Sequence, residues 1–453
     1  MEYQIYPGIE EKDCLMLRRY RRNLHKYPET GWLTYRTTAL AAEILEKAGY
    51  EVFAGEECVA FDLAEDTPDS RQIKRAADQC RQDLQNGLYQ KWKKRMGRLG
   101  GAVAVYDSGR PGETIAFRFD IDGLPVGEDG RMQERRPVAE NFMSRYPGCS
   151  HACGHDGHTA MGLVLARKLM ERRSELTGRL IFIFQTAEEG VRGAKSMCRS
   201  WKFGRIHKLI CCHIGFTGED QFVAGAGGFL ATTKLDVEFT GRSAHAGLCP
   251  ERGRNALLAA AEAAVKMQDI PVPETGIVRL NVGTFQAGEA RNTVPAHACF
   301  QMETRGSDSG KNQYMRRHAE EMIRACSEKY GVKCVFTEKG ESDSADSSRE
   351  LSRQLLEIAR NLGVYKDCLL HQTFGASDDG AVFMNKVQQE GGQAAYILLG
   401  TKQTGHHHES AFDFDEQVLD KGLAVLYRAA GAFCISGKKV SDPYVSEKEL
   451  CKL

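Results

Sequence analysis

Residues 151 to 158 read His151-Ala152-Cys153-Gly154-His155-Asp156-Gly157-His158, and the rest of the chain is best interpreted outward from this octapeptide. Three imidazoles, a thiol and a carboxylate at this density are typical of sites for Zn²⁺, Mn²⁺ or Co²⁺. The two glycines allow tight turns, so we expect a loop that gathers these side chains, followed by a helix over 159–175. The alternative is a polar loop that happens to contain histidines. Further donors downstream favour the metal site.

Other donors follow apolar segments that are typical of buried strands. The segment 114–119 leads into Asp120 and Asp122, 178–185 leads into Glu188 and Glu189, and 208–212 leads into His213. Because the carboxyl ends of parallel strands meet at one edge of a sheet, we expect these donors to lie together there. Strands that alternate with helices predict an α/β domain with a mostly parallel sheet and helices on both faces.

The pattern of polar and apolar residues changes after residue 230. Lys234 to Thr240 alternates polar and apolar side chains, as a strand with one exposed face does. With this strand as the first, the order is strand, helix, two strands, helix and strand, which predicts an inserted α+β, ferredoxin-like domain over 231–340. The first domain would then comprise 1–230 and 341–453, with a charged helical insertion at about 64–99 that we interpret as a solvated flap with one helix over 71–94.

Bulk properties exclude several partner classes. Lys+Arg 61 equals Asp+Glu 61 in 453 residues, which disfavours nucleic acid or an anionic membrane as a partner of the whole surface. The start of the chain lacks the basic and apolar pattern of a secretory leader, and no apolar run is long enough to span a bilayer. The 15 cysteines are scattered and odd in number, so we expect reduced thiols in a cytoplasmic protein.

The downstream donors extend the metal site. Candidate ligands are Cys153, His155, Glu189, His213 and one of the three histidines at 406–408. Five donors exceed what one tetrahedral ion needs, so we expect two divalent metal ions, Zn²⁺ or Mn²⁺, that share a bridging ligand. One glutamate of the adjacent pair can hold metal while its neighbour takes a proton from the attacking water. The alternative for this pair is an exposed helix start, where acids are favoured.

Four motifs, in this order, resemble the M20 metallopeptidase family and its amidohydrolase branch, subfamily D. They are Cys153 to His158, Ala187 to Gly190, Gly241 to Ala246 and Asn292 to Pro295. The resemblance extends from about Leu17 to Leu426. It implies that Cys153, His155, Glu189, His213 and His408 bind metal, with Cys153 as the bridge and Glu188 as the general base. His408 is implied because the family places this histidine four residues before the aromatic that opens an Asp-Phe segment.

The same resemblance assigns roles to the inserted domain. It implies a dimerisation and lid domain whose His245 reaches an active site, that of the dimer partner, and stabilises the developing oxyanion. Without the resemblance His245 reads as a structural histidine in a turn. Asn292 and Arg305 are expected to bind a substrate carboxylate. The chain is expected to form a homodimer or a heterodimer with a related subunit.

The sequence therefore predicts a metal-dependent amidohydrolase that cleaves a small-molecule N-acyl or N-aroyl amino acid. Within the branch, the 64–99 insertion and Pro28 to Trp32 are most similar to the group that hydrolyses p-aminobenzoyl-glutamate. Hippurate or other N-acyl amino acids are the alternative substrates, and a dipeptidase is the alternative reaction. An alternative of another class is a non-catalytic metal-binding partner subunit.

Overall fold

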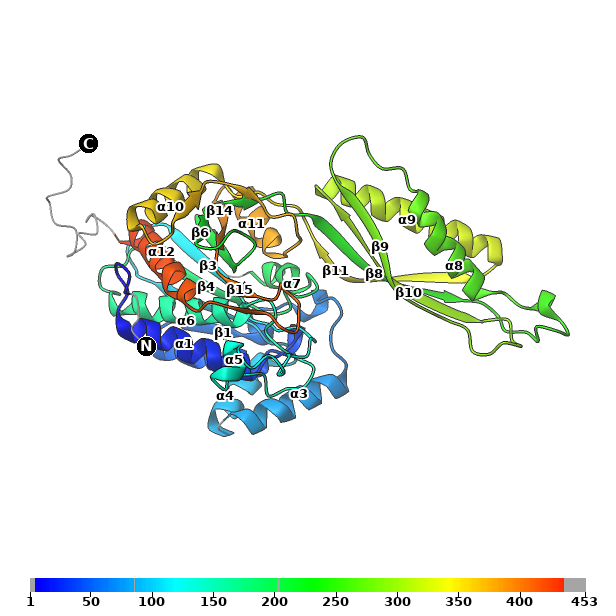
Figure 1. Ribbon diagram of the computed structural model, residues 1–453, viewed down its shortest axis with the longest axis horizontal. Coiled ribbons are helices and arrows are strands. Elements are labelled where there is room, and N and C mark those ends of the chain that lie inside the picture. The colour runs from blue at the N-terminus through cyan, green and yellow to red at the C-terminus, as the bar shows by residue number, and fades with distance from the viewer. Residues whose placement is uncertain (1–4, 85, 202–203, 436–453) are drawn as a thin grey trace.

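Two sheets organise the molecule, which is seen here in a computed structural model that describes residues 5–84, 86–201 and 204–435 (Figure 1). The larger sheet has the strand order β1-β2-β4-β3-β5-β14-β6-β12. Its strands are β1 (Glu51–Ala54), β2 (Ala102–Asp107), β4 (Arg179–Gln185), β3 (Thr114–Asp120), β5 (Lys208–Ile214), β14 (Gln393–Leu399), β6 (Gln221–Val223) and β12 (Asp367–Leu369). The central strands β4, β3, β5 and β14 are parallel, while β1, β2 and β6 pair antiparallel toward the edges. The predicted α/β class is confirmed.

Helices cover both faces of the larger sheet, and each layer has its own apolar core. One face packs against α1 (Glu11–Lys26), α2 (Tyr35–Ala48), α6 (His155–Glu171), α10 (Arg349–Leu362) and α12 (Gln417–Cys434). The other face packs against α7 (Gly193–Arg199) and α11 (Gly380–Gln389). Strands β3 and β4 are buried along almost their whole length, as the apolar runs that encode them require.

The smaller sheet lies to one side of the larger unit and has the order β11-β8-β10-β9 (Figure 1). Its elements are β8 (Ala231–Thr240), α8 (Ala256–Lys266), β9 (Val278–Ala287), β10 (His297–Gly306), α9 (Ser309–Tyr330) and β11 (Lys333–Ser342). All its strand pairs are antiparallel. This βαββαβ order is the ferredoxin-like topology expected from the sequence. One face packs on α8 and α9 around its own apolar core, and the 231–340 domain boundaries stay a prediction.

The charged insertion is more than a solvated flap, and it is not one helix. It forms α3 (Ser70–Asp83) and α4 (Asn86–Met96). Trp92 and Met96 of α4 are fully buried, and Cys80 of α3 is 1% exposed, so all three join the main core beside α2. The prediction of a solvated flap rested on the many charged residues of the insertion and overlooked these apolar positions, which recur at helical spacing on one face.

The remaining short elements lie mostly in loops around the sheet edges. They are α5 (Arg136–Ala139), β7 (Ala226–Gly227), β13 (Gln372–Thr373), β15 (Gln403–Thr404), β16 (Asp413–Phe414) and the 3-10 turns η1 (Gly31–Leu33), η2 (Gly55–Glu57), η3 (Phe61–Leu63), η4 (Pro250–Arg252) and η5 (Met267–Asp269). Within the described ranges, none of the helices has the length and apolar character that crossing a bilayer requires.

Candidate metal centre

The donors predicted from the sequence meet at the carboxyl edge of the parallel strands. Strand β3 ends at Asp120, β4 delivers Glu188 and Glu189, and His213 lies near the end of β5. The loop after β14 carries His408. Since β4, β3, β5 and β14 run in the same direction, their following segments gather at one edge.

The octapeptide forms a turn over 151–154 and then the first turn of a helix, where the sequence predicted a loop throughout. Helix α6 begins at His155, directly after Gly154, whose φ of +88° is left-handed. The predicted start at 159 was therefore wrong by about one turn. Gly157 lies inside the helix, and a Cβ there would come within 2.7 Å of the Phe414 ring. Close packing, and not a turn, explains this glycine.

Two groups of donor atoms share Cys153. The ligand atoms of Cys153, His155 and His213 lie within 4.8 Å of one another, as do those of Cys153, Glu189 and His408. The Cys153 Sγ atom is 3.5 Å from His213 Nε2, and His408 Nε2 is 3.6 Å from Glu189 Oε2. A thiolate has lone pairs for two ions, so this arrangement suits two metals with a common sulfur.

Hydrogen bonds fix which nitrogen each imidazole offers. His155 Nδ1 lies 2.8 Å from the Asp122 carbonyl oxygen, and His213 Nδ1 lies 2.8 Å from the Ile214 carbonyl oxygen. Because a carbonyl only accepts, both Nδ1 atoms carry the proton, and both Nε2 atoms keep a lone pair for metal.

His158 differs because both of its ring nitrogens are already used. Its Nδ1 bonds Asp120 and its Nε2 accepts from the Ile214 N–H at 2.9 Å. The ring therefore joins β3 to β5 and has no nitrogen left for a metal ion.

Unpaired buried atoms show that a divalent cation fits here. His155 Nε2 and Glu189 Oε1 lie 3.9 Å apart, and neither has a hydrogen-bond partner in the described part of the chain. Burial alone lowers the pKa of His155, but Asp120, Asp122 and Glu189 outweigh it and raise the pKa to about 10. The cluster therefore favours positive charge at this point. Sulfur, nitrogen and oxygen donors together suit Zn²⁺ and related ions.

The turn that carries both glutamates is strained, and hydrogen bonds to Asp122 hold it in place. Ala187 and Val191 have positive φ values of 55° and 58° without being glycine, a conformation that costs energy and is common at functional sites. The Asp122 carboxylate accepts the backbone N–H groups of Glu188 and Glu189, each at 3.1 Å. Asp122 thus orients both acids as well as His155, although its sequence signal was only an acid after a strand.

Glu188 faces an acidic layer that the sequence did not reveal. The carboxylate oxygens of Glu188, Asp378 and Asp379 lie within 4.8 Å of one another. Burial, with Asp378 and Glu189, raises the pKa of Glu188 well above its usual value. Beneath them, the buried Arg118 guanidinium lies 2.8 Å from Asp120, 3.2 Å from Asp378 and 3.3 Å from Asp379. The sequence of 375–380, which has a glycine at each end, predicts only a tight polar loop there.

The position of Asp156 beside His155 predicts that it orients a ligand imidazole, but in the structure it does not. Its carboxylate lies 2.7 Å from His25 Nδ1 and 3.2 Å from Arg21 Nε. Both partners belong to α1, so Asp156 joins α1 to α6. The first turn of a helix spreads neighbouring side chains around its axis, which separates Asp156 from His155.

The three site residues predicted in the inserted segment lie outside this cluster. His245 is exposed, and its Nδ1 accepts the N–H groups of Gly247 and Leu248. The backbone of His245 forms an isolated β-bridge with Thr293, which is the neighbour of Asn292 in sequence. This bridge lies beyond the carboxyl end of β8. A ten-residue strand spans about 30 Å, so His245 does not reach the cluster of its own chain.

Arg305 lies on β10 and is already paired. Its guanidinium contacts the Glu303 carboxylate at 2.9 Å and 3.1 Å. Any role in binding a substrate carboxylate requires this pair to open or to act as a unit.

A cavity of about 440 Å³ opens beside the donors and is lined by Glu189 and His408. The exposed half of the His408 side chain faces this space (55% exposed). The opposite wall comes from the insertion, with Asp66, Thr67, Pro68 and Gln72, and from Lys234 of the smaller sheet. The volume suits a small molecule.

Comparison with known proteins agrees with this architecture. Residues 116–432 match the model of peptidase family M20/M25/M40. The chain is 40% identical over 420 residues to a p-aminobenzoyl-glutamate hydrolase subunit of Escherichia coli (strain K12), which covers 91% of this chain and 95% of that protein. It is 40% identical over 405 residues to indole-3-acetyl-aspartic acid hydrolase of Enterobacter agglomerans, covering 88% and 92%.

A solved structure extends the likeness to three dimensions. An aminobenzoyl-glutamate utilization protein from Klebsiella pneumoniae superposes with a TM-score of 0.79 at 34% identity, over 92% of this chain and 96% of that one. With a family model that matches most of the chain and relatives at this identity, the chain belongs to peptidase family M20/M25/M40 and is a metal-dependent hydrolase.

Proposed function

We propose that this chain hydrolyses the amide bond of N-acyl or N-aroyl amino acids, with p-aminobenzoyl-glutamate as the leading substrate. The observation that carries the proposal is the pair of donor groups that share Cys153 directly beside Glu188. The names of two relatives at 40% identity refer to an aromatic or indole acyl group joined to an acidic amino acid, which supports this substrate class. Hippurate, other N-acyl amino acids and dipeptides are the alternatives.

We propose that Cys153, His155, Glu189, His213 and His408 hold two divalent metal ions. Zn²⁺ and Mn²⁺ are the leading candidates, and the cysteine and histidine donors favour Zn²⁺. Bound there, the metals would supply Lewis acidity that polarises the amide carbonyl and makes water more acidic. The protein itself orients two of the proposed ligands, because the carbonyl oxygens of Asp122 and Ile214 accept hydrogen bonds from the Nδ1 atoms of His155 and His213.

Glu188 is the proposed proton carrier. Asp122 holds its backbone, and its side chain lies 3.9 Å from His155 Nε2, next to the donor groups. It takes a proton from the water that attacks the carbonyl carbon and then gives that proton to the departing nitrogen. Burial, together with Asp378, Glu189 and Asp379, raises the pKa of Glu188, which suits a group that must retain a proton between two steps.

The inserted unit is the proposed lid and dimerisation domain. It exposes large apolar side chains, among them Leu248 at 80% and Val265 at 70%. Its edge strand β9 pairs only with β10 among the strands that the structure describes. Exposed apolar surface of this kind is typical of an interface. We propose that a homodimer, or a heterodimer with a related subunit, brings His245 to the partner's cluster, with Asn292 and Arg305 as weaker candidates for contacts to the substrate.

The test compares wild type with Glu188→Gln after loading with Zn²⁺, Mn²⁺ or Co²⁺. We expect the variant to keep its metal, measured by elemental analysis, and to lose about 10²- to 10⁴-fold in kcat on p-aminobenzoyl-glutamate. Near-normal turnover in the variant would refute the role of Glu188. A wild-type chain that binds metal but hydrolyses none of the N-acyl amino acids or dipeptides would favour a non-catalytic partner subunit.

A further inference from the structure

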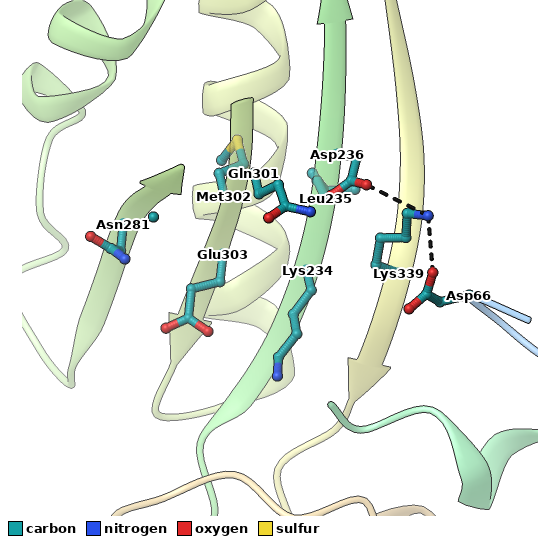
Figure 2. Close-up of a pocket in the computed structure, with 10 residues that line it drawn as sticks. Asp66, Lys234, Leu235, Asp236, Asn281, Gln301, Met302, Glu303 and Lys339 are labelled. Carbon is teal, nitrogen blue, oxygen red and sulfur yellow. Dashed lines mark hydrogen bonds and ion pairs between the residues drawn. The ribbon is translucent and has the colours of Figure 1, made fainter. Parts of the chain in front are cut away.

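Two cavities meet at Lys234, on the first strand of the smaller sheet. The cavity beside the donor cluster is lined by Glu189, His408 and Lys234. A second cavity, of about 380 Å³, lies on the open face of the smaller sheet and is also lined by Lys234. Figure 2 shows the Lys234 ammonium extending along this face, away from Gln301 and Asp236. Lys234 is therefore the residue of the smaller sheet that lines both cavities.

Neighbouring cations of the two cavities are already paired with carboxylates. Lys339 lies 3.0 Å from Asp66 and 3.5 Å from Asp236 (Figure 2). Arg192 contacts Asp66 at 2.6 Å. Each of these groups has an anion that neutralises it.

Lys234 differs from these neighbours. Among the residues that the structure describes, its ammonium has no hydrogen bond and no ion pair, although the side chain is half-buried. Glu303, its register partner on β10, contributes most to its electrostatic surroundings, and Glu188 and Glu189 contribute less. None of the three forms an ion pair with Lys234 among the described residues, and Glu303 is already bound by Arg305. A partly buried charge without a partner is unfavourable. The two metal ions proposed above would neutralise the nearby acids and leave Lys234 available for an anion in the cavity.

We propose that Lys234 binds a carboxylate of the amino-acid half of the substrate. The inference rests on the proposed function, since every N-acyl amino acid carries an α-carboxylate and an acidic amino acid carries a second one in its side chain. Either carboxylate presents the same chemistry to an ammonium. Held there, the amino-acid half lies against the smaller sheet while the amide faces Glu188 and the donor cluster.

The test measures binding and needs no turnover. L-glutamate, L-glutamine and isoglutamine are titrated calorimetrically into the metal-loaded wild type and Lys234→Met, because the last two ligands each lack one carboxylate. We expect the variant to bind L-glutamate about 10- to 100-fold more weakly. The ligand that lacks the carboxylate bound by Lys234 should have equal Kd values in the two proteins, so glutamine identifies the side-chain group and isoglutamine the α-carboxylate.

Two further variants make the result specific. Lys234→Arg keeps the charge and should restore part of the affinity for L-glutamate. Lys339→Met removes a lysine of the same sheet cavity whose ammonium is already paired, and it should change all three affinities by the same factor.

The outcomes separate this inference from the proposed reaction. Equal losses for all three ligands in Lys234→Met, or no binding of any of them to wild type, would overturn the role of Lys234. Carboxylate-specific binding in a protein that hydrolyses no N-acyl amino acid would support Lys234 and refute only the proposed reaction.

Discussion

Asp122 is the residue whose replacement tests the organisation of the centre most directly. Its carboxylate accepts the N–H groups of Glu188 and Glu189, each at 3.1 Å, and its carbonyl accepts from His155. The substitution Asp122→Asn keeps the size and shape of the side chain. Its NH₂ group must face one of the two backbone N–H donors, so one hydrogen bond is lost and two donors oppose each other.

The expected effect follows from these contacts. A hydrogen bond to a charged group contributes about 1.5–3 kcal/mol, and a buried donor left unpaired adds a further cost, so we expect a loss of about 2–4 kcal/mol in the free energy of unfolding. The strained turn that carries Glu188 and Glu189 is held less firmly, and a shift of about 1 Å in a catalytic group lowers turnover by about 10²-fold. Metal content should fall little, because all five proposed ligands remain.

The assay combines kcat on p-aminobenzoyl-glutamate, elemental analysis and denaturant unfolding. Asp13→Asn is the matched control, since Asp13 is equally buried and accepts from Lys168 at 2.7 Å and the Glu10 N–H at 2.9 Å, far from the cluster. The control should lose stability but keep kcat. Wild-type kcat in Asp122→Asn, or the same fall in kcat in both variants, would refute the positioning role.

Three other predictions concern the metal, pH and assembly. A chelator should abolish hydrolysis and lower the thermal midpoint, because it leaves His155 Nε2 and Glu189 Oε1 unpaired, and re-addition of Zn²⁺, Mn²⁺ or Co²⁺ should restore both. Burial lowers the pKa of His25, but Asp156 and Glu128 outweigh it and raise the pKa to about 9. Its stabilisation, about 3 kcal/mol, is therefore complete below the unfolded pKa of about 6.5 and is lost as pH rises through about 9. Unfolding measured from pH 6 to 10 should show this fall in wild type and not in His25→Gln. The His245→Ala and Glu188→Gln variants should each lack hydrolytic activity alone. A mixed dimer of the two should regain activity, because the Glu188→Gln subunit supplies His245 to the intact cluster of the other subunit. No recovery after subunit exchange would contradict the proposal.

The sequence correctly predicted that the candidate metal ligands gather at one edge of the larger sheet, and the reason is the topology of that sheet. Strands β3, β4 and β5 are apolar runs with acids or a histidine at or just after their carboxyl ends, and parallel pairing brings these ends together at one edge of the sheet. The choice of His408 among three histidines came only from the family resemblance. Its positive φ of 69° and the bond from its N–H to the Ala152 carbonyl at 2.8 Å are set by the fold, so periodicity alone could not select it.

The parts that the sequence missed depend on contacts between distant segments. Arg118 meets Asp378 and Asp379 across more than 250 residues, and nothing local distinguishes these acids from a polar loop. Asp156 was misassigned because closeness in sequence was taken for closeness in space. Gly157 was read as a turn, although Phe414, far along the chain, is what excludes a side chain there.

The pairing of β8 with β11 has a consequence for how this protein can be modified. Thr232 and Ser342 are register partners at the base of the smaller sheet, so the chain leaves and re-enters the larger unit at two points only about 5 Å apart. A short turn could join these residues without displacing either strand end. We therefore expect that the smaller unit can be deleted, or exchanged for that of a relative, without breaking the chain that carries the candidate metal ligands.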